Sequence, residues 1–550
     1  MRSGANTIVI VGSGFAGTIL ARALNARGRR VVLVERHTHP RFAIGESSTP
    51  LASICLERLA VEYDLPDLLA LTTYGRWNRE LPSIGHGLKR GFSFYRHRPN
   101  HAFANSPRNE ARLLVGASPD NEIADSHWLR SDVDHHLVRR ATSEGVEFID
   151  NCEVERAERR GDGWALQMNR SGRSLRLDAD FVVDATGGMP FLPADAKSEF
   201  NELTVRSAGI SGERGRNSLG AKGVAPPDTG LIFGHFQGVA SFSDVADEAS
   251  FLKPPYPEER AAVHHLLEEG WMYVLSFDND LVSAGFVIDR THSDSHRFLN
   301  TPPDEAWQAL MSRYPTIERQ FAASEPTRKL TSVPRIQRRR VSGAGPGWAL
   351  LPHAFSFVSP MFSTGIAWSL TGVERLAAAL SNDGDRRLWK LSEHDRMLQT
   401  EADHITSLVT PAYRLRQDFD AFVAWTQVYF AAASYHEVWQ RLSDPPSEEG
   451  WRGVGFLGAC DPILRRAKVE ATDQLETAYM DRSIKKKIRG SELENLVGQI
   501  IVNRNLAGLA NPTRNRMYPV DLSLLLRHGD MLGLSDEELR VRLPRIRGKS

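Results

Sequence analysis

Residues 7–17 read TIVIVGSGFAG and are followed by TILARALNARG (18–28) and by a second apolar run, VVLVE (31–35). The β-branched run at 7–11 predicts a strand that is buried on both faces. Residues 18–28 have helical periodicity. The order of strand, glycine-rich turn, helix, strand and terminal acid is typical of a Rossmann-like βαβ unit. This stretch therefore predicts an α/β fold that begins with a dinucleotide-binding unit.

The three glycines of the turn, Gly12, Gly14 and Gly17, have G-x-G-x-x-G spacing, and each has its own physical role. Gly12 permits the tight turn, Gly14 lets a pyrophosphate approach the backbone, and Gly17 lets the helix pack closely on the strand. The phosphates would face the helix N-terminus. Glu35 can accept hydrogen bonds from ribose hydroxyls and would repel a 2′-phosphate, which favours FAD or NAD over NADP. The neighbouring residues Ala16 and Arg36 are assigned to the same cofactor site.

Three later segments favour FAD over NAD. RFAIGESSTP (41–50) follows the second strand without a regular βαβ continuation, and HWLRSDVDHHLVRRATSEGV (127–146) predicts a loop that enters a helix. FVVDATGG (181–188) predicts a strand that ends in an acid and a glycine turn, which suits a second approach of the backbone to the cofactor. The further cofactor-binding residues predicted from these segments are Gly45, Glu46, Ser47, Arg130, Asp184 and Gly187.

Composition excludes several classes of function. The chain has 550 residues with 68 Lys+Arg and 68 Asp+Glu, so nothing indicates binding to nucleic acid or to an anionic membrane. The three cysteines are far apart and lack the spacing of a metal site, which predicts a reducing compartment. Neither a secretory pattern nor a membrane-spanning apolar run is visible, so a cytoplasmic location is expected.

Three segments resemble the flavin-dependent halogenases: HPRFAIGESSTP (39–50), GLKRGFSF (87–94) and ALLPHAFSFVSPMFSTG (349–365). The likeness is to the branch that acts on phenols and pyrroles, often in antibiotic biosynthesis. The family signature F-x-x-P-x-x-S-x-G is present as Phe357, Pro360, Ser363 and Gly365. Phe362 stands where the tryptophan-halogenating branch has a glutamate. Pro352-His353 replaces the Gly-Asp pair of many flavin hydroxylases, to whose p-hydroxybenzoate-hydroxylase-like fold the resemblance also extends.

The resemblance implies a mechanism with two separate sites. FADH2, supplied by a separate NAD(P)H-dependent flavin reductase, would use O2 to oxidise chloride or bromide to hypohalous acid. Backbone N–H groups of Thr364 and Gly365 would hold the halide, and Phe357, Pro360 and Gly365 would lie at the flavin. Lys89 would position or carry the halogen in a separate chamber. The expected substrate is a small aromatic, either free or tethered to a carrier protein. No second nicotinamide-type glycine motif is visible, which favours the external reductase.

EEGWMYVLSF (268–277) predicts a strand with Trp271, Tyr273, Leu275 and Phe277 on one face. By itself this pattern indicates a face packed in the core. The resemblance adds that Trp271 and Tyr273 belong to the wall that separates substrate from flavin, because halogenases have W-x-W-x-I-P here. Tyr273 and Ser276 depart from that pattern. They leave open a flavin monooxygenase that hydroxylates its substrate, and a non-catalytic flavin-binding protein is a third alternative.

The predicted fold class is α/β, with a Rossmann-like FAD-binding domain, an interleaved antiparallel sheet for the substrate and a C-terminal helical region. The FAD-binding domain is expected from residues 1–80, 125–195 and 335–385, and the sheet domain from residues 81–124 and 196–334. Residues 386–550 make up the helical region, including helices at 420–442 and 534–546. The Gly-rich and charged segment 212–230 predicts a loop that covers the active site. No metal site is predicted.

Overall fold

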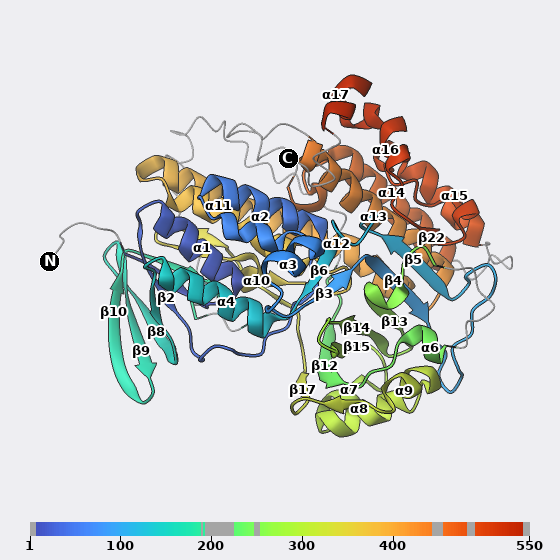
Figure 1. The fold of residues 1–550 in the computed structure, drawn as a ribbon, viewed down its shortest axis with the longest axis horizontal. Helices are drawn as coiled ribbons and strands as arrows, with labels where there is room; N and C mark the ends of the chain where they lie inside the picture. The colour runs from blue at the N-terminus through green and yellow to red at the C-terminus, as the bar shows by residue number, and fades with distance from the viewer. Residues whose placement is uncertain are drawn as a thin grey trace.

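A computed structural model describes residues 7–188, 191–192, 225–246, 254–442, 455–480 and 490–542. Most of the predicted loop 212–230 lies outside the described residues. Three bodies of structure are visible in Figure 1: a helix-covered parallel sheet, a large second sheet, and a cluster of helices that ends the chain. This arrangement matches the predicted fold class.

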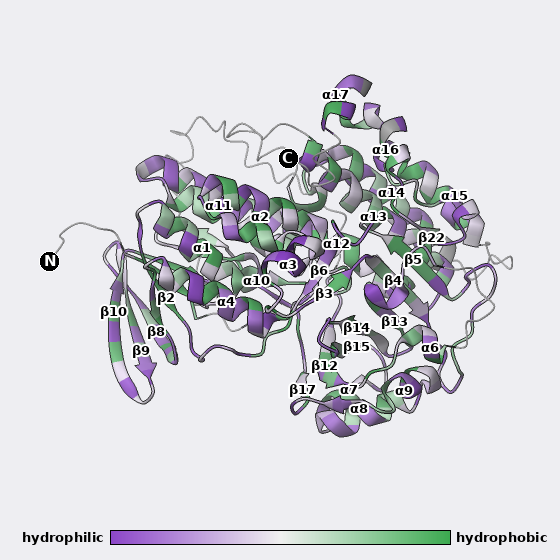
Figure 2. Cartoon of the chain, in the orientation of Figure 1, coloured by the Kyte–Doolittle hydropathy of each residue, from purple (hydrophilic) through white to green (hydrophobic). Residues whose placement is uncertain are grey.

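A six-stranded sheet forms the first body, and β1 lies near its centre with β11 and β2 parallel on either side. Its strands are largely buried except for the edge strand β7, as expected for apolar runs between helices. Helix α1 (Phe15–Ala26) packs against α4 (Arg130–Ser143) and α11 (Gly365–Leu380), and α11 packs against α2 (Pro50–Glu62). Figure 2 shows α1, α2 and α11 coloured largely as hydrophobic. The order of the strands across the sheet is β19 (Ala344–Gly345), β20 (Trp348–Leu350), β11 (Phe181–Asp184), β1 (Thr7–Val11), β2 (Arg30–Val34) and β7 (Glu147–Ile149).

A small antiparallel sheet of three strands extends from the first body and is formed by the residues that follow β7 and precede β11 in the sequence. It was not predicted from the sequence as a separate unit. Its strands carry many exposed charged residues, and only part of one face is buried. The strands are β8 (Cys152–Arg160), β9 (Gly163–Arg170) and β10 (Arg173–Ala179).

The second body is a nine-stranded sheet whose pairs are antiparallel except for β13 with β4 and β5 with β22. One face packs against the hydrophobic core that includes the six-stranded sheet and is called the FAD-side core below. The other face is covered by α7 (Ser295–Asn300), α8 (Pro303–Met311) and α9 (Pro315–Phe321). The strands are β16 (Glu325–Pro326), β12 (Thr229–Gln237), β15 (Leu281–Asp289), β14 (Gly270–Ser276), β13 (Ala262–Leu266), β4 (Gly91–Arg96), β5 (Arg112–Gly116), β22 (Met517–Tyr518) and, paired with β12, β17 (Thr331–Val333).

The C-terminal region is helical but also contributes a strand to the second sheet. β22 pairs in parallel with β5 and so covers an edge that would otherwise present unpaired backbone groups. The helices are α12 (Gly384–Leu415), α13 (Phe419–Leu442), α14 (Pro462–Met480), α15 (Gly490–Ile500), α16 (Leu522–Arg527) and α17 (Asp536–Arg542). Helix α13 coincides with the helix expected at 420–442, and α17 lies within the segment expected to be helical at 534–546, whose last four residues are outside the described part of the chain. Among the helices that the structure describes, none is long and apolar enough to cross a membrane.

Candidate functional site

The turn between β1 and α1 is built so that only glycine fits at two of its three glycine positions. Gly12 has a φ of +110°, and a Cβ there would lie 2.5 Å from the carbonyl oxygen of Ala185. A Cβ on Gly17 would lie 2.1 Å from the carbonyl oxygen of Gly12, so this position is closed by helix–strand packing. A Cβ on Gly14 would meet nothing nearer than the Arg130 Nη2 atom at 3.2 Å. Gly14 is therefore not required by the fold itself, which is consistent with a ligand approaching its backbone.

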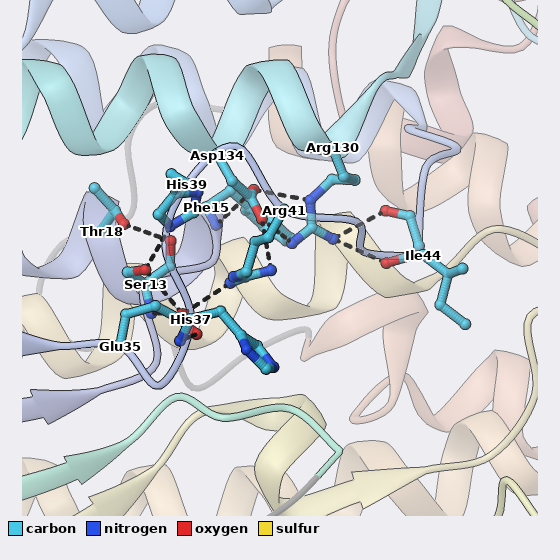
Figure 3. A network of polar contacts seen from close by, with 11 residues as sticks. Ser13, Phe15, Thr18, Glu35, His37, His39, Arg41, Ile44, Arg130 and Asp134 are labelled. Carbon is cyan, nitrogen blue, oxygen red and sulfur yellow. Dashed lines mark hydrogen bonds and ion pairs between the residues drawn. The ribbon is translucent and has the colours of Figure 1, made fainter. Parts of the chain in front are cut away.

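Glu35 lies directly beside this turn, at the end of β2 (Figure 3). Its Oε2 atom accepts hydrogen bonds from the Ser13 backbone N–H (3.1 Å) and hydroxyl (2.9 Å) and from Arg41 Nη2 (3.0 Å). Burial favours the neutral acid, but attraction by Arg41 and the hydrogen bonds from Ser13 outweigh it and lower the pKa of Glu35. The carboxylate is thus held ionised at the place where a ribose would be bound.

A second carboxylate, Asp134, joins α4 to the start of α1. It accepts hydrogen bonds from the Phe15 N–H (3.0 Å) and, through both oxygens, from Arg130 (2.9 and 2.8 Å). Arg130 also donates to the carbonyl oxygens of Ile44 (3.0 Å) and Gly45 (3.3 Å), which fixes the loop after β2 (Figure 3). Residues from three distant segments therefore surround the N-terminus of α1.

The same place holds polar atoms that are buried without a partner. His39 Nδ1 and Arg41 Nε are buried and have no hydrogen-bond partner among the described residues. Arg41 and Arg130 both point guanidinium nitrogens at Gly14, within 3.8 Å of the position of its missing Cβ. Two guanidinium groups, unused polar atoms and a helix N-terminus fit the pyrophosphate of FAD. His39 and Arg41 were not assigned to the cofactor site from the sequence. The only indication of their role in the sequence is their position in the loop after the second strand.

The other predicted cofactor residues form a second group near β11 and α11. Asp184 is fully buried and accepts hydrogen bonds from the Thr186 N–H and hydroxyl and from the Phe191 N–H, which shapes the turn containing Gly187 (φ +70°). Ser47 accepts a hydrogen bond from the Ser363 hydroxyl (3.0 Å), which joins the loop after β2 to the start of α11. The side chains of Ala16 and Arg36 are partly buried and exposed, respectively.

Two basic residues that were not predicted as cofactor residues, Arg338 and His353, lie beside this second group. Arg338 donates to the carbonyl oxygen of His353 (2.7 Å) and lies 5.3 Å from the centre of the Phe357 ring. Burial lowers the pKa of Arg338 to about 10 and that of His353 to about 3. The His353 ring lies 3.4 Å from the position a Cβ would take on Gly365, so it contacts the first turn of α11.

The predicted halide residues lie at the N-terminus of α11. Ser363 has a φ of +53°, its N–H donates to the carbonyl oxygen of Pro360 (3.0 Å), and Thr364 is the N-cap of a 16-residue helix. The first N–H groups of such a helix have no intrahelical acceptor and carry partial positive charge. This terminus can bind a small anion, and Thr364 also lines a neighbouring cavity.

Lys89 is fully buried at the end of β3 (His86–Lys89), opposite Asp125 in β6 (Asp125–Trp128). Its ammonium donates to the carbonyl oxygen of Ser48 and lies 4.2 Å from the centre of the Phe92 ring. Burial lowers the pKa of Lys89 to about 8 although Asp125 and Glu437 attract the cation. Burial raises the pKa of Asp125 to about 7, against attraction by Lys89.

A cavity of about 180 Å³ connects these features. Phe92, the neighbour of Lys89, and Thr364, at the start of α11, both line it, and Tyr429 and Glu437 of α13 form another side. The Tyr429 ring is stacked at 4.0 Å on Phe362. The far end is lined by apolar residues of the C-terminal region, including Leu506 and Leu525. Since this cavity lies beside both the halide residues and the surroundings of Lys89, it is the candidate substrate chamber.

Strand β14 presents alternate side chains to two different hydrophobic cores, as the alternation predicts. Trp271, Tyr273 and Leu275 face the FAD-side core, whereas Met272 and Val274 face the core beneath α7–α9. Trp271 Nε1 donates to Tyr413 Oη (2.8 Å), and its ring lies 5.2 Å from His264, which in turn lies 6.0 Å from Phe92. Tyr273 lies near Glu46. Burial is the larger cause, and the charge of Glu46 the smaller one, that raises the pKa of the Tyr273 phenol. Phe277 lies just beyond the strand and packs against His127 and His235.

The sequence profile described as "FAD dependent oxidoreductase" matches residues 7–354. The chain belongs to the FAD-dependent oxidoreductase family. Tetracycline 7-halogenase of Kitasatospora aureofaciens is 27% identical over 437 residues, covering 78% of this chain and 72% of that protein. Monodechloroaminopyrrolnitrin halogenase PrnC of Pseudomonas fluorescens is 26% identical over 428 residues, covering 76% of this chain and 69% of that protein.

The solved structures show the same fold. The crystal structure of halogenase PltM in complex with phloroglucinol and FAD has a TM-score of 0.76 at 23% identity and covers 94% of this chain and all of that one. Together with the motifs, these relatives support the resemblance of this FAD-dependent oxidoreductase to the flavin-dependent halogenases. The family prediction is confirmed, and FAD is the cofactor that the residues around Gly14 fit.

Proposed function

We propose that this FAD-dependent oxidoreductase uses FADH2, O2 and chloride or bromide to halogenate an electron-rich aromatic ring of the phenol or pyrrole type. The observation that carries the proposal is a fully buried lysine, Lys89, beside a chamber that also reaches the N-terminus of α11. When bound, reduced FAD would activate O2, the oxidant that converts halide to hypohalous acid. The names of relatives that act on tetracycline or on pyrrole-2-carbonyl carrier proteins agree with this class of substrate.

Each group of residues has a task in this proposal. The residues around Gly14, together with Glu35 and Arg130, bind the dinucleotide, and the N–H groups of Thr364 and Gly365 hold the halide. Trp271 and Tyr273 keep the aromatic substrate away from the flavin. The Lys89 ammonium donates a hydrogen bond to hypohalous acid and so polarises the oxygen–halogen bond toward the ring. The chamber is smaller than the roughly 300–1,000 Å³ typical of drug-sized ligand sites, which suits a substrate whose reacting part is a single ring.

Turnover with a panel of substrates tests the proposal. The purified protein is supplied with FAD, NADH, a separate flavin reductase and either chloride or bromide. The panel contains free phenols, free pyrroles and a pyrrole-2-carbonyl group on a carrier protein, and mass spectrometry detects the halogen isotope pattern. Cell fractionation tests the proposed cytoplasmic location alongside the reductase. Products that gain only one oxygen would identify the alternative, a hydroxylating monooxygenase, which the replacements at Tyr273 and Ser276 left open.

Variants at two buried lysines separate halide oxidation from halogen transfer. Lys89→Met is expected to keep FAD binding and O2 consumption while aromatic halogenation falls by orders of magnitude. Lys468 is the matched control, because burial also lowers its pKa to about 8, but it lies in α14 next to His404 and Ser407 of α12. Lys468→Met should halogenate at the native rate. Full halogenation by Lys89→Met would refute the assigned role of Lys89.

A further inference from the structure

Helix α13 lines the substrate chamber with a stripe of residues spaced four apart: Tyr429, Ala433, Glu437 and Arg441. Glu437 is the acid of this stripe, and it lies about 12 Å along the helix from Tyr429. Its side chain is partly exposed because it faces the cavity. Within the described part of the chain, Glu437 forms neither a hydrogen bond nor an ion pair. The other charged lining residues have partners: Arg441 pairs with Glu57, and Asp521 accepts hydrogen bonds from Ser523. Glu437 therefore presents its carboxyl group to the chamber.

Glu437 belongs to one electrostatic cluster with the lysine of the proposed reaction. Lys89 on β3, Asp125 on β6 and Glu437 on α13 all interact through their charges, and Arg441 acts on both acids. His127 and His264 also face Lys89 but are neutral, because burial lowers their pKa values to about 3 and 4. Asp125 Oδ2 is buried without a hydrogen bond among the residues described. The cluster thus combines one donor of a proton and two acceptors, of which Glu437 lines the chamber.

We propose that Glu437 is the base that removes the ring proton during halogenation, and that Asp125 is a positioning residue that holds Lys89 as an ammonium. This assignment rests on the proposed function. It identifies a substrate-facing catalytic residue on a C-terminal helix, outside the motifs that suggested the activity.

The proton balance of the step closes within the cluster. The ring carbon forms a bond to the halogen while the oxygen–halogen bond of hypohalous acid breaks. The leaving hydroxide takes a proton from the Lys89 ammonium and becomes water. The ring C–H bond then breaks, its electron pair restores the aromatic ring, and its proton goes to the Glu437 carboxylate. Transfer of a proton from neutral Glu437 to neutral Lys89 restores both groups, and the net change is ArH + HOX to ArX + H2O.

The pKa values of Glu437 and Lys89 are shifted toward each other. Burial, followed by repulsion from Asp125, raises the pKa of Glu437 well above its usual value. Burial lowers the pKa of Lys89 to about 8. Because the pKa of Glu437 is raised and that of Lys89 is lowered, the difference between them is smaller than for the free groups, which eases transfer of a proton from one to the other.

The test is Glu437→Gln, which removes the base and keeps its size. Glu374→Gln is the matched control, because burial also raises the pKa of Glu374, to about 7, but this residue lies on α11 beside Cys55. A soluble amine captures hypohalous acid in a parallel assay, and a ring-deuterated substrate reports on C–H cleavage. Glu437→Gln should form captured hypohalous acid at the native rate and lose about 100-fold in aromatic halogenation. It should also show a primary deuterium isotope effect that the native enzyme and Glu374→Gln lack. Glu437→Asp should restore part of the rate.

The outcomes distinguish this assignment from the function on which it rests. Native-rate halogenation by Glu437→Gln, or a loss of rate without an isotope effect, would overturn the role of Glu437 alone. The absence of captured hypohalous acid from the native enzyme would overturn the proposed function and the assignment together. Asp125→Asn should shift the pH profile of halogenation to lower pH, because Lys89 loses its nearby carboxylate and deprotonates more easily. An unchanged profile would refute the positioning role of Asp125.

Discussion

Replacement of Lys89 by methionine should change stability in a way that depends strongly on pH. Methionine preserves the length of the buried side chain but leaves Asp125 without the cation opposite it in the β3–β6 pair. Removing one partner of a buried charge pair typically costs about 3–5 kcal/mol when the remaining group stays charged. Asp125 can avoid much of that cost by binding a proton, since burial already raises its pKa to about 7.

The direction in which stability changes with pH follows from the pKa of each group in the folded and in the unfolded chain. The pKa of Asp125 is raised from 3.8 to about 7, so its contribution to stability is complete below pH 4 and is lost as the pH rises to 7. In Lys89→Met that pKa rises further, and the loss continues above pH 7 at about 1.4 kcal/mol per pH unit. The pKa of Lys89 is lowered from 10.5 to about 8, so the native protein regains stability from this group between pH 8 and 10.5, and the variant does not.

The expected result is a crossover in thermal stability. At pH 5 Lys89→Met should melt at or above the native temperature, because it buries no ammonium and Asp125 is neutral. By pH 9 it should melt several degrees lower. Calorimetric scans of both proteins from pH 5 to 9, at one FAD concentration, measure this difference. The double variant Lys89→Met/Asp125→Asn should lose the pH dependence. A melting difference that is constant across this range, or that persists in the double variant, would refute the argument.

Three other predictions concern the cofactor turn and the wall. Gly17→Ala should prevent correct folding because its Cβ would lie 2.1 Å from a carbonyl oxygen, whereas Gly14→Val should fold and fail to retain flavin. Melting curves and the flavin content of the purified variants test both expectations. Flavin bound normally by Gly14→Val would contradict the assignment of the pyrophosphate to this turn. FAD released from native protein by acid should stay in the filtrate, since the binding predicted is non-covalent, and flavin in the pellet would show otherwise. Tyr413→Phe should lower the free energy of unfolding by about 1–3 kcal/mol, because it leaves the buried Trp271 N–H without its acceptor. Adding Trp271→Phe to this variant should cost less than Trp271→Phe costs in the native protein. If the two costs measured in denaturant melts simply add, that hydrogen bond does not contribute to stability.

Features encoded within a short stretch could be predicted from the sequence. The strand, turn and helix of residues 7–28 follow from alternation, glycine spacing and helical periodicity, all of which are local. The faces of β14 were predictable for the same reason, because side chains alternate across any strand. The roles of the individual cofactor and halide residues stay predictions, although the structure brings most of them together.

Features that depend on distant segments could not be predicted. Strand β22 has two residues and pairs with β5, some 400 positions earlier in the chain, so it carries no periodic signal of its own. Glu437 lines the candidate chamber because α13 packs beside the sheet, and nothing in the sequence around residue 437 indicates that placement. Arg41 was inside a quoted motif but was not assigned, since its contact with Glu35 depends on how the loop folds back.

The replacement of proline by Ser276 was the main sequence-based reason to consider a hydroxylase, and the geometry of β14 weakens it. The strand stays paired with β15 through Ser276, which lies opposite Val282. The next residue, Phe277, donates its N–H to the Leu281 carbonyl oxygen (2.8 Å), and hydrogen-bonded and non-hydrogen-bonded pairs alternate along an antiparallel ladder. The Ser276 N–H therefore points away from β15, so a proline here would remove no bond between these strands. The Ser276 carbonyl oxygen is also held against Gly87, where a Cβ would lie only 2.0 Å away. Because backbone packing fixes this end of the wall with either residue, Ser276 by itself gives substrate no new route to the flavin.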